Sequence, residues 1–174
     1  ITRVVSLGEI TQEEKDDYTI VLKGTIEGSH AIFPVGSKGY QIDAITRRPM
    51  WSTLRNYGHG TGHGIGFFLN VHEGPHVFNP TPTDIAIEEG MITSIEPGLY
   101  REGKHGIRIE NLVLAKKYDN SIFGDFMNFE TLTISYIDTD LVNRDLLGQE
   151  HIDWLNQYNQ FVFDKLAPFL TTSE

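Results

Sequence analysis

Residues 58–75 read GHGTGHGIGFFLNVHEGP, and this stretch constrains the structure more than any other part of the chain. Glycine occupies every second position of its first nine residues. Because glycine costs about 1 kcal/mol relative to alanine inside a helix, the stretch is predicted to be extended. Successive side chains of an extended chain face opposite ways, so one face should carry only glycines and the other His59, Thr61 and His63. That second face could present two imidazoles to a ligand.

The density of histidines around this stretch favours a functional site. The simplest alternative is a flexible glycine loop that carries histidines by chance. However, His72 and His76 follow closely, so four of the seven histidines fall within eighteen residues. We therefore favour a site over a plain loop.

Two glutamates further along the chain are candidate partners of these histidines. Glu96 ends the apolar run 92–95 and precedes a Pro-Gly turn, whereas Glu110 lies inside the apolar run 107–114. A carboxylate is costly to bury unless it is paired or bound to metal. The alternatives are a surface charge for Glu96 and an ion pair between Glu110 and Arg108, which alternation places on the same strand face.

An imidazole and two carboxylates together form a mostly oxygen-rich ligand set. Such a set suits Mn²⁺ or Co²⁺ and tolerates Zn²⁺. Two divalent ions held by shared carboxylates would activate a water for attack on a peptide carbonyl.

The order of predicted elements favours an α+β fold with an antiparallel or mixed sheet. Thr11 and Glu14 form a capping-box pattern that starts a helix running to about residue 32, and a second helix is predicted over 40–54. The C-terminal apolar periodicity predicts an amphipathic helix. Strands are predicted over 1–8, 92–95, 107–114 and 132–137.

Composition limits the classes of partner. The chain has 174 residues, a net charge of −10 and no cysteine. This charge disfavours a nucleic acid and an anionic membrane surface, and no apolar run reaches the roughly 20 residues of a membrane span. Disulfides and thiolate metal sites are excluded, which is compatible with a cytoplasmic location. Because the chain starts with Ile1 rather than Met, we interpret it as part of a longer protein.

Three segments carry a family resemblance: residues 58–75, 95–98 (IEPG) and 106–111 (GIRIEN). They resemble the motifs of the aminopeptidase P family, in the creatinase/methionine-aminopeptidase ("pita-bread") superfamily. The likeness covers residues 1–137, and residues 138–174 resemble the C-terminal extension of the long, three-domain members. The resemblance implies an incomplete pita-bread fold: a curved mixed or antiparallel sheet, helices on its outer face, and a C-terminal helical extension.

The resemblance also implies metal-dependent hydrolysis of the bond before a proline at the second position of a peptide. His63, Glu96 and Glu110 match the family's metal ligands, with Glu96 also shuttling a proton and Glu110 bridging two ions. The cofactor implied is two divalent ions, manganese first, with zinc or cobalt as alternatives.

Other residues match substrate-binding positions. His59 and His72 match histidines that contact the substrate and stabilise the tetrahedral intermediate, as donors aimed at developing charge would. Arg108 matches an arginine that positions an acidic ligand near the substrate. His76 and His105 match no assigned position, and we expect them to be surface histidines.

The family's two upstream aspartate ligands, and a further substrate-binding histidine, have no counterpart in this chain. Glu96 and Glu110 could neutralise one divalent ion at most. We therefore expect weak binding of a single ion and no activity from the 174 residues alone.

Three other functions remain open: a prolidase, a methionine aminopeptidase, and a non-catalytic binding module of the same fold. The stretch Phe67-Phe68-Leu69-Asn70 favours aminopeptidase P, and retention of the three ligand positions disfavours the binding module. The resemblance suggests a homodimer formed by the C-terminal extension, with packing within one chain as the alternative. The residues to test are Trp154, Leu155, Tyr158 and Phe161.

Overall fold

The computed structural model describes residues 1–68 and 70–171, so Leu69 of the predicted family stretch lies outside the described residues. Helix α1 (Gln12–Ser29) starts at the predicted capping box: the hydroxyl of Thr11 accepts from the Glu14 amide, and the Glu14 carboxylate accepts from the Thr11 amide. The helix ends before residue 32 because the chain turns into strand β1 (Phe33–Pro34), which pairs with β8 (Gly124–Thr131).

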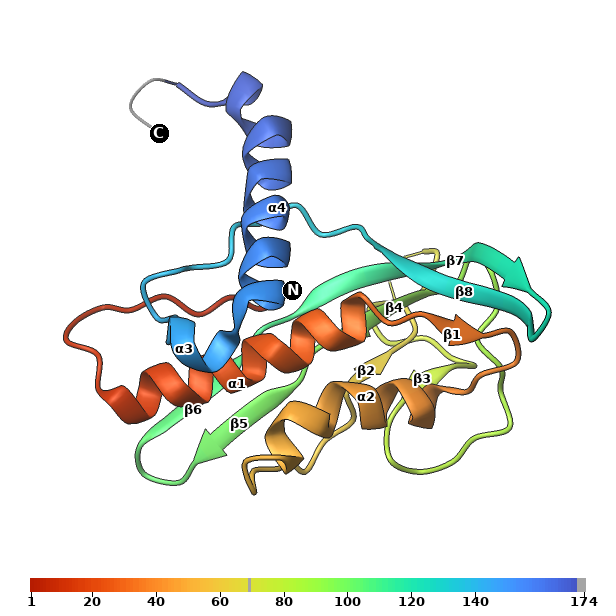
Figure 1. Cartoon of the computed structure of the whole chain (residues 1–174), viewed down its shortest axis with the longest axis horizontal. Helices are drawn as coiled ribbons and strands as arrows, with labels where there is room; N and C mark the ends of the chain where they lie inside the picture. Colours follow the sequence, from red (N-terminus) through yellow and green to blue (C-terminus); the bar gives the residue numbers. More distant parts are fainter. Residues whose placement is uncertain (69, 172–174) are drawn as a thin grey trace.

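Helix α2 (Gly39–Trp51) packs along α1, and both lie on one side of the sheet (Figure 1). The predicted end near residue 54 is three residues too late. The last turn of the helix accommodates Pro49. Leu54, however, takes a positive φ of 58°, which is incompatible with a continuing helix.

The main sheet has the order β1-β8-β7-β4, with β4 (Ile92–Ile95) antiparallel to β7 (Asn111–Ser121). Two short ribbons accompany it: β2 (Gly62–His63) pairs with β3 (Val77–Phe78), and β5 (Gly98–Arg101) pairs with β6 (His105–Arg108). Every pair formed by the strands of the described ranges is antiparallel, which selects one of the two predicted sheet types.

Three strand predictions need correction. Residues 107–114 do not form one strand: β6 ends at Arg108 and β7 begins at Asn111, because the partner changes from β5 to β4. Residues 132–137 form no strand, and side chains of α4 hold them instead. Residues 1–8 form no strand, since a single backbone hydrogen bond, from Glu110 to Thr2, joins them to the sheet.

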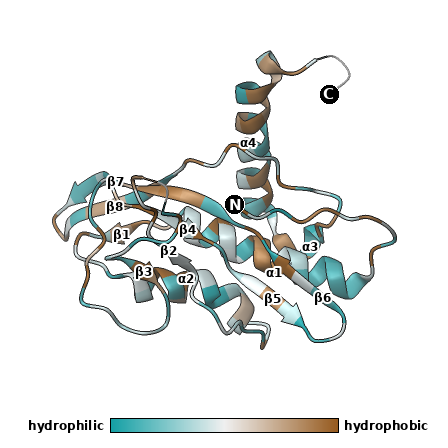
Figure 2. Ribbon diagram, turned by 180° about the vertical axis from the view of Figure 1, so that it is seen from behind, coloured by the Kyte–Doolittle hydropathy of each residue, from teal (hydrophilic) through white to brown (hydrophobic). Residues whose placement is uncertain are grey.

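The C-terminal segment contains α3 (Arg144–Leu147), the predicted amphipathic helix α4 (Gln149–Leu166) and a 3₁₀ turn, η1 (Ala167–Phe169). Helix α4 projects from the body and carries both apolar and polar residues (Figure 2). Leu155, Tyr158 and Val162 on its inner face are buried in one apolar cluster with α1, β6 and α3. Among the helices of the described residues, none combines the length and apolarity that crossing a lipid bilayer requires.

Candidate metal centre

The structure brings His63 of β2, Glu96 after β4 and Glu110 after β6 together. One ligand atom from each lies within 4.8 Å of the other two. Their side chains are 18%, 14% and 12% exposed, so the cluster is sheltered but open to solvent. Among the described residues, these are the three His, Asp or Glu side chains that lie close enough together to hold one metal ion.

The contact between His63 and Glu96 itself calls for a positive charge. Nδ1 of His63 lies 3.0 Å from the carbonyl oxygen of Gly64, which can only accept, so Nδ1 carries the ring proton and donates it. In the neutral imidazole Nε2 therefore carries a lone pair, which faces a Glu96 oxygen at 3.2 Å. Two acceptors at this distance repel each other unless a proton or a cation lies between them. Two ligands about 2.1 Å from one ion, at right angles or slightly wider, are about 3.0–3.4 Å apart, so the spacing fits a metal.

Ser94 fixes the relative position of His63 and Glu96. Its hydroxyl accepts from the backbone amide of His63 at 3.0 Å and donates to Glu96 at 3.1 Å. Ser94 is fully buried in β4, so both candidate ligands are oriented from a strand of the main sheet. An outer partner of this kind sets the orientation of metal ligands.

The glycines before and after His63 allow β2 to reach this strand. A Cβ atom on Gly62 would overlap the backbone carbonyl of Ser94, and one on Gly64 would overlap the carbonyl of Glu73. The predicted glycine face therefore packs directly against backbone. The predicted opposite face is wrong for Thr61, because β2 begins only at Gly62 and Thr61 is buried against helix α2.

Glu110 lies in the break between β6 and β7, and the N-terminal segment holds it. The hydroxyl of Thr2 donates to its carboxylate at 2.8 Å, and its amide donates to the carbonyl of Thr2 at 3.1 Å. The predicted alternative, an ion pair with Arg108, is not formed: Nη1 of Arg108 lies 3.5 Å from Glu96 instead.

Tyr100 of β5 joins His59 to Arg108, a role that no sequence pattern predicted. Its hydroxyl lies 2.8 Å from Nε2 of His59 and accepts from Nε of Arg108 at 3.0 Å. Nδ1 of His59 lies 2.7 Å from the carbonyl of Gly60, so in the neutral ring Nε2 accepts the tyrosine proton. A continuous chain of polar contacts thus runs from His59 through Tyr100 and Arg108 to Glu96.

Two buried residues of α2 anchor the segment that carries His59. Arg47 and Asp43 form an ion pair at 2.7 Å, with both side chains 2% exposed. Arg47 donates to the carbonyls of Tyr57 and His59, and Asp43 accepts from the hydroxyl of Thr61. The signal that could have revealed the pair is an acid and a base four residues apart within a helix that the fold buries.

The remaining histidines take different places. His72 is exposed, and its ring meets that of His63 edge-on at 4.2 Å between centroids, next to the three-residue cluster. His76 and His105 were expected at the surface, and this is wrong for both. His76 is buried and its Nε2 contacts the carbonyl of Ile92, while His105 contacts the buried Asp17 at 2.9 Å.

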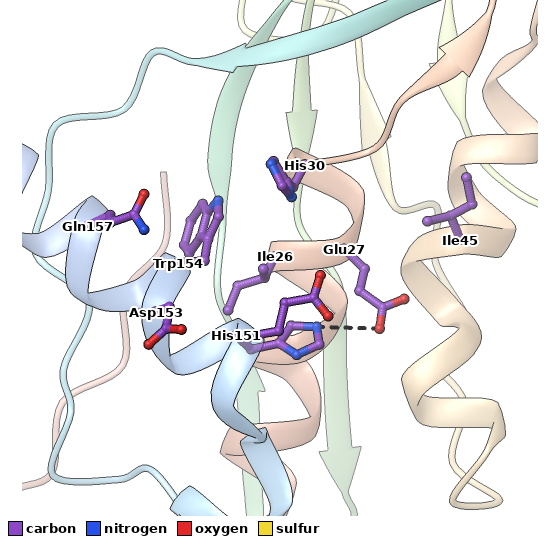
Figure 3. A pocket seen from close by; sticks show the side chains of 9 residues that line it. Ile26, Glu27, His30, Ile45, His151, Asp153, Trp154 and Gln157 are labelled. Atoms are coloured by element: carbon purple, nitrogen blue, oxygen red, sulfur yellow. Dashed lines mark ion pairs between the residues drawn. The ribbon is translucent and has the colours of Figure 1, made fainter.

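A second hollow is separate from this cluster. A cavity of about 410 Å³ lies between α1, α2 and α4, and Figure 3 shows the side chains around it. Nε2 of His151 on α4 lies 3.5 Å from the Glu27 carboxylate of α1 on its wall. None of His63, Glu96 and Glu110 lines this cavity, so it is not part of the candidate metal centre.

Comparison with known proteins agrees with this geometry. The family model described as metallopeptidase family M24 matches residues 1–117. The chain belongs to metallopeptidase family M24. A second model, described as the C-terminal region of peptidase M24, matches residues 125–174, so this M24 chain carries both regions.

Curated relatives of this M24 chain are considerably longer. It is 42% identical over 170 residues to Xaa-Pro aminopeptidase 2 of Homo sapiens, covering 98% of this chain and 25% of that protein. It is also 42% identical over 173 residues to Aminopeptidase P1 of Lotus japonicus, covering 98% of this chain and 26% of that protein. The chain therefore spans about a quarter of the length of the curated relatives it matches.

Solved structures confirm the predicted fold class and the family resemblance. The X-prolyl aminopeptidase of Caenorhabditis elegans, described as a cytosolic enzyme with a di-nuclear active site, matches with a TM-score of 0.89 at 38% identity, over 95% of this chain and 27% of that one. The Xaa-Pro dipeptidase of Bacillus anthracis matches with a TM-score of 0.63 at 32% identity, over 78% of this chain and 35% of that one.

Proposed function

We propose that this chain supplies part of the active site of a metal-dependent aminopeptidase that releases the residue preceding a proline. The observation that carries the proposal is the contact of His63 with Glu96, two acceptors spaced as ligands of one metal ion would be, with Glu110 close by. The likeness to Xaa-Pro aminopeptidases over nearly the whole chain supports the substrate class.

In this proposal His63, Glu96 and Glu110 hold divalent metal, with manganese the first candidate, then zinc or cobalt. A bound ion would supply Lewis-acid chemistry and lower the pKa of a water. Glu96 accepts and returns the proton of the attacking water, held in place by Ser94 and Arg108. Glu110 would be the carboxylate that both ions share. A donor set of one imidazole and two carboxylates has too little charge for two ions, so the remaining ligands come from residues outside these 174.

His59, His72 and Arg108 are proposed to contact the substrate. In the neutral ring Nε2 of His59 accepts from Tyr100, so it can donate to the substrate only after it gains a proton and the tyrosine hydroxyl moves aside. His72 is exposed beside His63, where it can reach a peptide bound over the metal. Arg108 lies between Glu96 and Tyr100 and orients both.

A prolidase is the second candidate, because a dipeptidase structure also matches the chain. The higher TM-score and coverage of the aminopeptidase favour the first. A non-catalytic module is a weaker candidate, since the three proposed ligands lie together as catalysis requires. A methionine aminopeptidase is weaker because the likeness over nearly the whole chain is to Xaa-Pro aminopeptidases.

Proposals about assembly and location depend on other observations. The 39% exposure of Phe161 is compatible with a homodimer contact on α4, together with part of Trp154. Leu155 and Tyr158 are buried within their own chain, which favours the intramolecular alternative for those two. A cytoplasmic location is proposed because the relative from Caenorhabditis elegans is described as cytosolic.

The test uses the complete enzyme, meaning the polypeptide that contains this chain together with the residues that supply the missing ligands. Metal content is measured on the same sample as cleavage of peptides with proline in the second position. We expect metal and cleavage of long peptides, with both lost in His63→Ala and retained in His30→Ala, a matched change outside the cluster. Cleavage of Xaa-Pro dipeptides alone would instead indicate a prolidase. Turnover by the isolated 174 residues would contradict the proposed incomplete ligand set.

A further inference from the structure

The C-terminal helix reaches the vicinity of Glu110 through one buried hydroxyl group. Tyr158 of α4 is 6% exposed, and its hydroxyl lies 2.9 Å from the carbonyl of Thr133, 3.0 Å from that of Ser135 and 2.9 Å from Nη2 of Arg3. A hydroxyl has one proton, so it donates to a carbonyl and accepts from the guanidinium. Burial raises the pKa of Tyr158, so the hydroxyl keeps its proton.

Arg3 carries this contact onward to the proposed ligand. Its guanidinium donates to the backbone carbonyl of Glu110 and, at 2.8 Å, to the side-chain oxygen of Asn111. The neighbouring Thr2 holds the amide and the carboxylate of the same glutamate. Both sides of Glu110 are thus held by Thr2 and Arg3. Arg3 is held in turn by the hydroxyl of Tyr158 and by the backbone carbonyls of Ser135 and Tyr136, and of these partners Tyr158 is the one that α4 supplies.

Glu110 depends on these contacts because the sheet does not hold it. It lies outside both flanking strands, where the partner changes from β5 to β4. Its neighbours Ile109 and Asn111 are fully buried, but its own amide bonds only to Thr2. A ligand outside the ladder is oriented by its side-chain partners.

We infer that α4 is a positioning element for the metal centre, and that the hydroxyl of Tyr158, acting through Arg3, sets the position of Glu110. This rests on the proposed function, in which Glu110 binds metal. Tyr158 touches neither metal nor substrate, so it is a positioning residue. Leu155 and Val162 supply the apolar packing of the same helix face, and the hydroxyl is not needed for that.

The test titrates the metal-free complete enzyme with Mn²⁺ by calorimetry and compares single-atom variants. Tyr158→Phe should weaken the apparent metal affinity about 10-fold, as loss of an outer partner of a ligand does. Tyr118→Phe removes the same atom from an exposed tyrosine and should leave the affinity unchanged. Val162→Ala should lower the thermal midpoint without weakening metal binding, because it removes packing alone.

Arg3→Lys gives an independent second variant, because it keeps the charge but loses the fork that joins Tyr158 to Glu110. It should weaken metal affinity as well, and the double variant should lose less than the sum of the two changes. An unchanged affinity in Tyr158→Phe, or an equal loss in Val162→Ala, would overturn the inference. A wild type that binds no Mn²⁺ would instead overturn the proposed function, and the role of Glu110 with it.

Discussion

The hydroxyl of Tyr100 lies 2.8 Å from Nε2 of His59, which ties a histidine of the glycine-rich segment to the β5–β6 ribbon. The same oxygen accepts from Nε of Arg108, whose guanidinium lies against Glu96. One phenol therefore orients two groups that are proposed to contact the substrate. Both contacts are made by the hydroxyl group, so an apolar ring at this position could not replace them.

Tyr100→Phe should lower kcat/KM about 10-fold or more, because it removes the partner of Nε2 of His59 and of Nε of Arg108 and so loosens both side chains. Metal affinity should change much less than kcat/KM, since Glu96 keeps its hydrogen bond from Ser94 and its contact with Nη1 of Arg108, neither of which needs the tyrosine hydroxyl. Steady-state kinetics and a metal titration on the complete enzyme measure the two effects. A variant with weakened metal binding and normal kcat/KM at saturating metal would contradict this assignment.

Removal of Arg47 should destabilise the fold severely. Arg47→Met would leave the carboxylate of Asp43 buried without its counter-ion and two backbone carbonyls without a donor. Breaking a buried ion pair from one side costs about 3–5 kcal/mol. Denaturant unfolding measures the loss.

The neighbouring Arg48 provides the matched control. It lies on the same helix, but its side chain is 71% exposed, and it pairs with Glu27, whose side chain is 13% exposed. Arg48→Met should therefore cost about 1 kcal/mol or less. Equal losses in the two variants would show that the buried network does not anchor the segment around His59.

Gly62→Ala should prevent β2 from docking on β4. The added methyl group would overlap the backbone carbonyl of Ser94, which cannot move without breaking the ladder between β4 and β7. We expect little folded protein, and loss of metal from what remains, measured by circular dichroism and metal analysis. Gly8→Ala adds the same group where no atom lies within 4 Å, and it should behave as wild type.

The fold was predictable where local chemistry and tertiary contacts favour the same structure. The capping box of Thr11 and Glu14 marks the start of α1, and the apolar periodicity of α4 matches the face buried around Leu155. Strand β4 was also predicted at its observed bounds. In these elements the pattern of buried side chains follows from residues that are close together in the sequence, within one or two helical turns or strand pleats.

The failed predictions concern long-range partners, which leave no local pattern. Ile107, Ile109 and Val113 alternate as in one strand, yet the partner of the chain changes after Arg108. The segment 132–137 alternates equally well, but Asn159 and Tyr158 bond its backbone in place of a strand. Tyr100 carried no signal, because its role depends on His59, which is 41 positions away in the sequence, and on Arg108 of the neighbouring strand.

His151 provides a pH-dependent test of how α4 docks on α1. Burial first, and then the nearby charge of Lys23, hold the pKa of His151 below its usual value of about 6.5, although Glu27 and Glu150 oppose this. The unfolded chain therefore binds more protons than the folded one as the pH falls through that value. By linkage, stability is fully present above about pH 6.5 and is progressively lost as the pH falls towards the lower pKa of the folded state.

His151→Gln removes this titration, so the variant should lose less stability than wild type between about pH 7 and pH 5. Thermal midpoints of the complete enzyme at several pH values in that range, referred to pH 8 for each protein, measure the difference. Lys23→Gln should make the wild-type loss smaller, because it removes a charge that lowers the pKa of His151 and so narrows the gap between the folded and unfolded pKa values. Parallel pH profiles for wild type and His151→Gln would mean that the imidazole keeps its usual affinity for protons in the folded chain, and that the contact with Glu27 in Figure 3 offsets its burial.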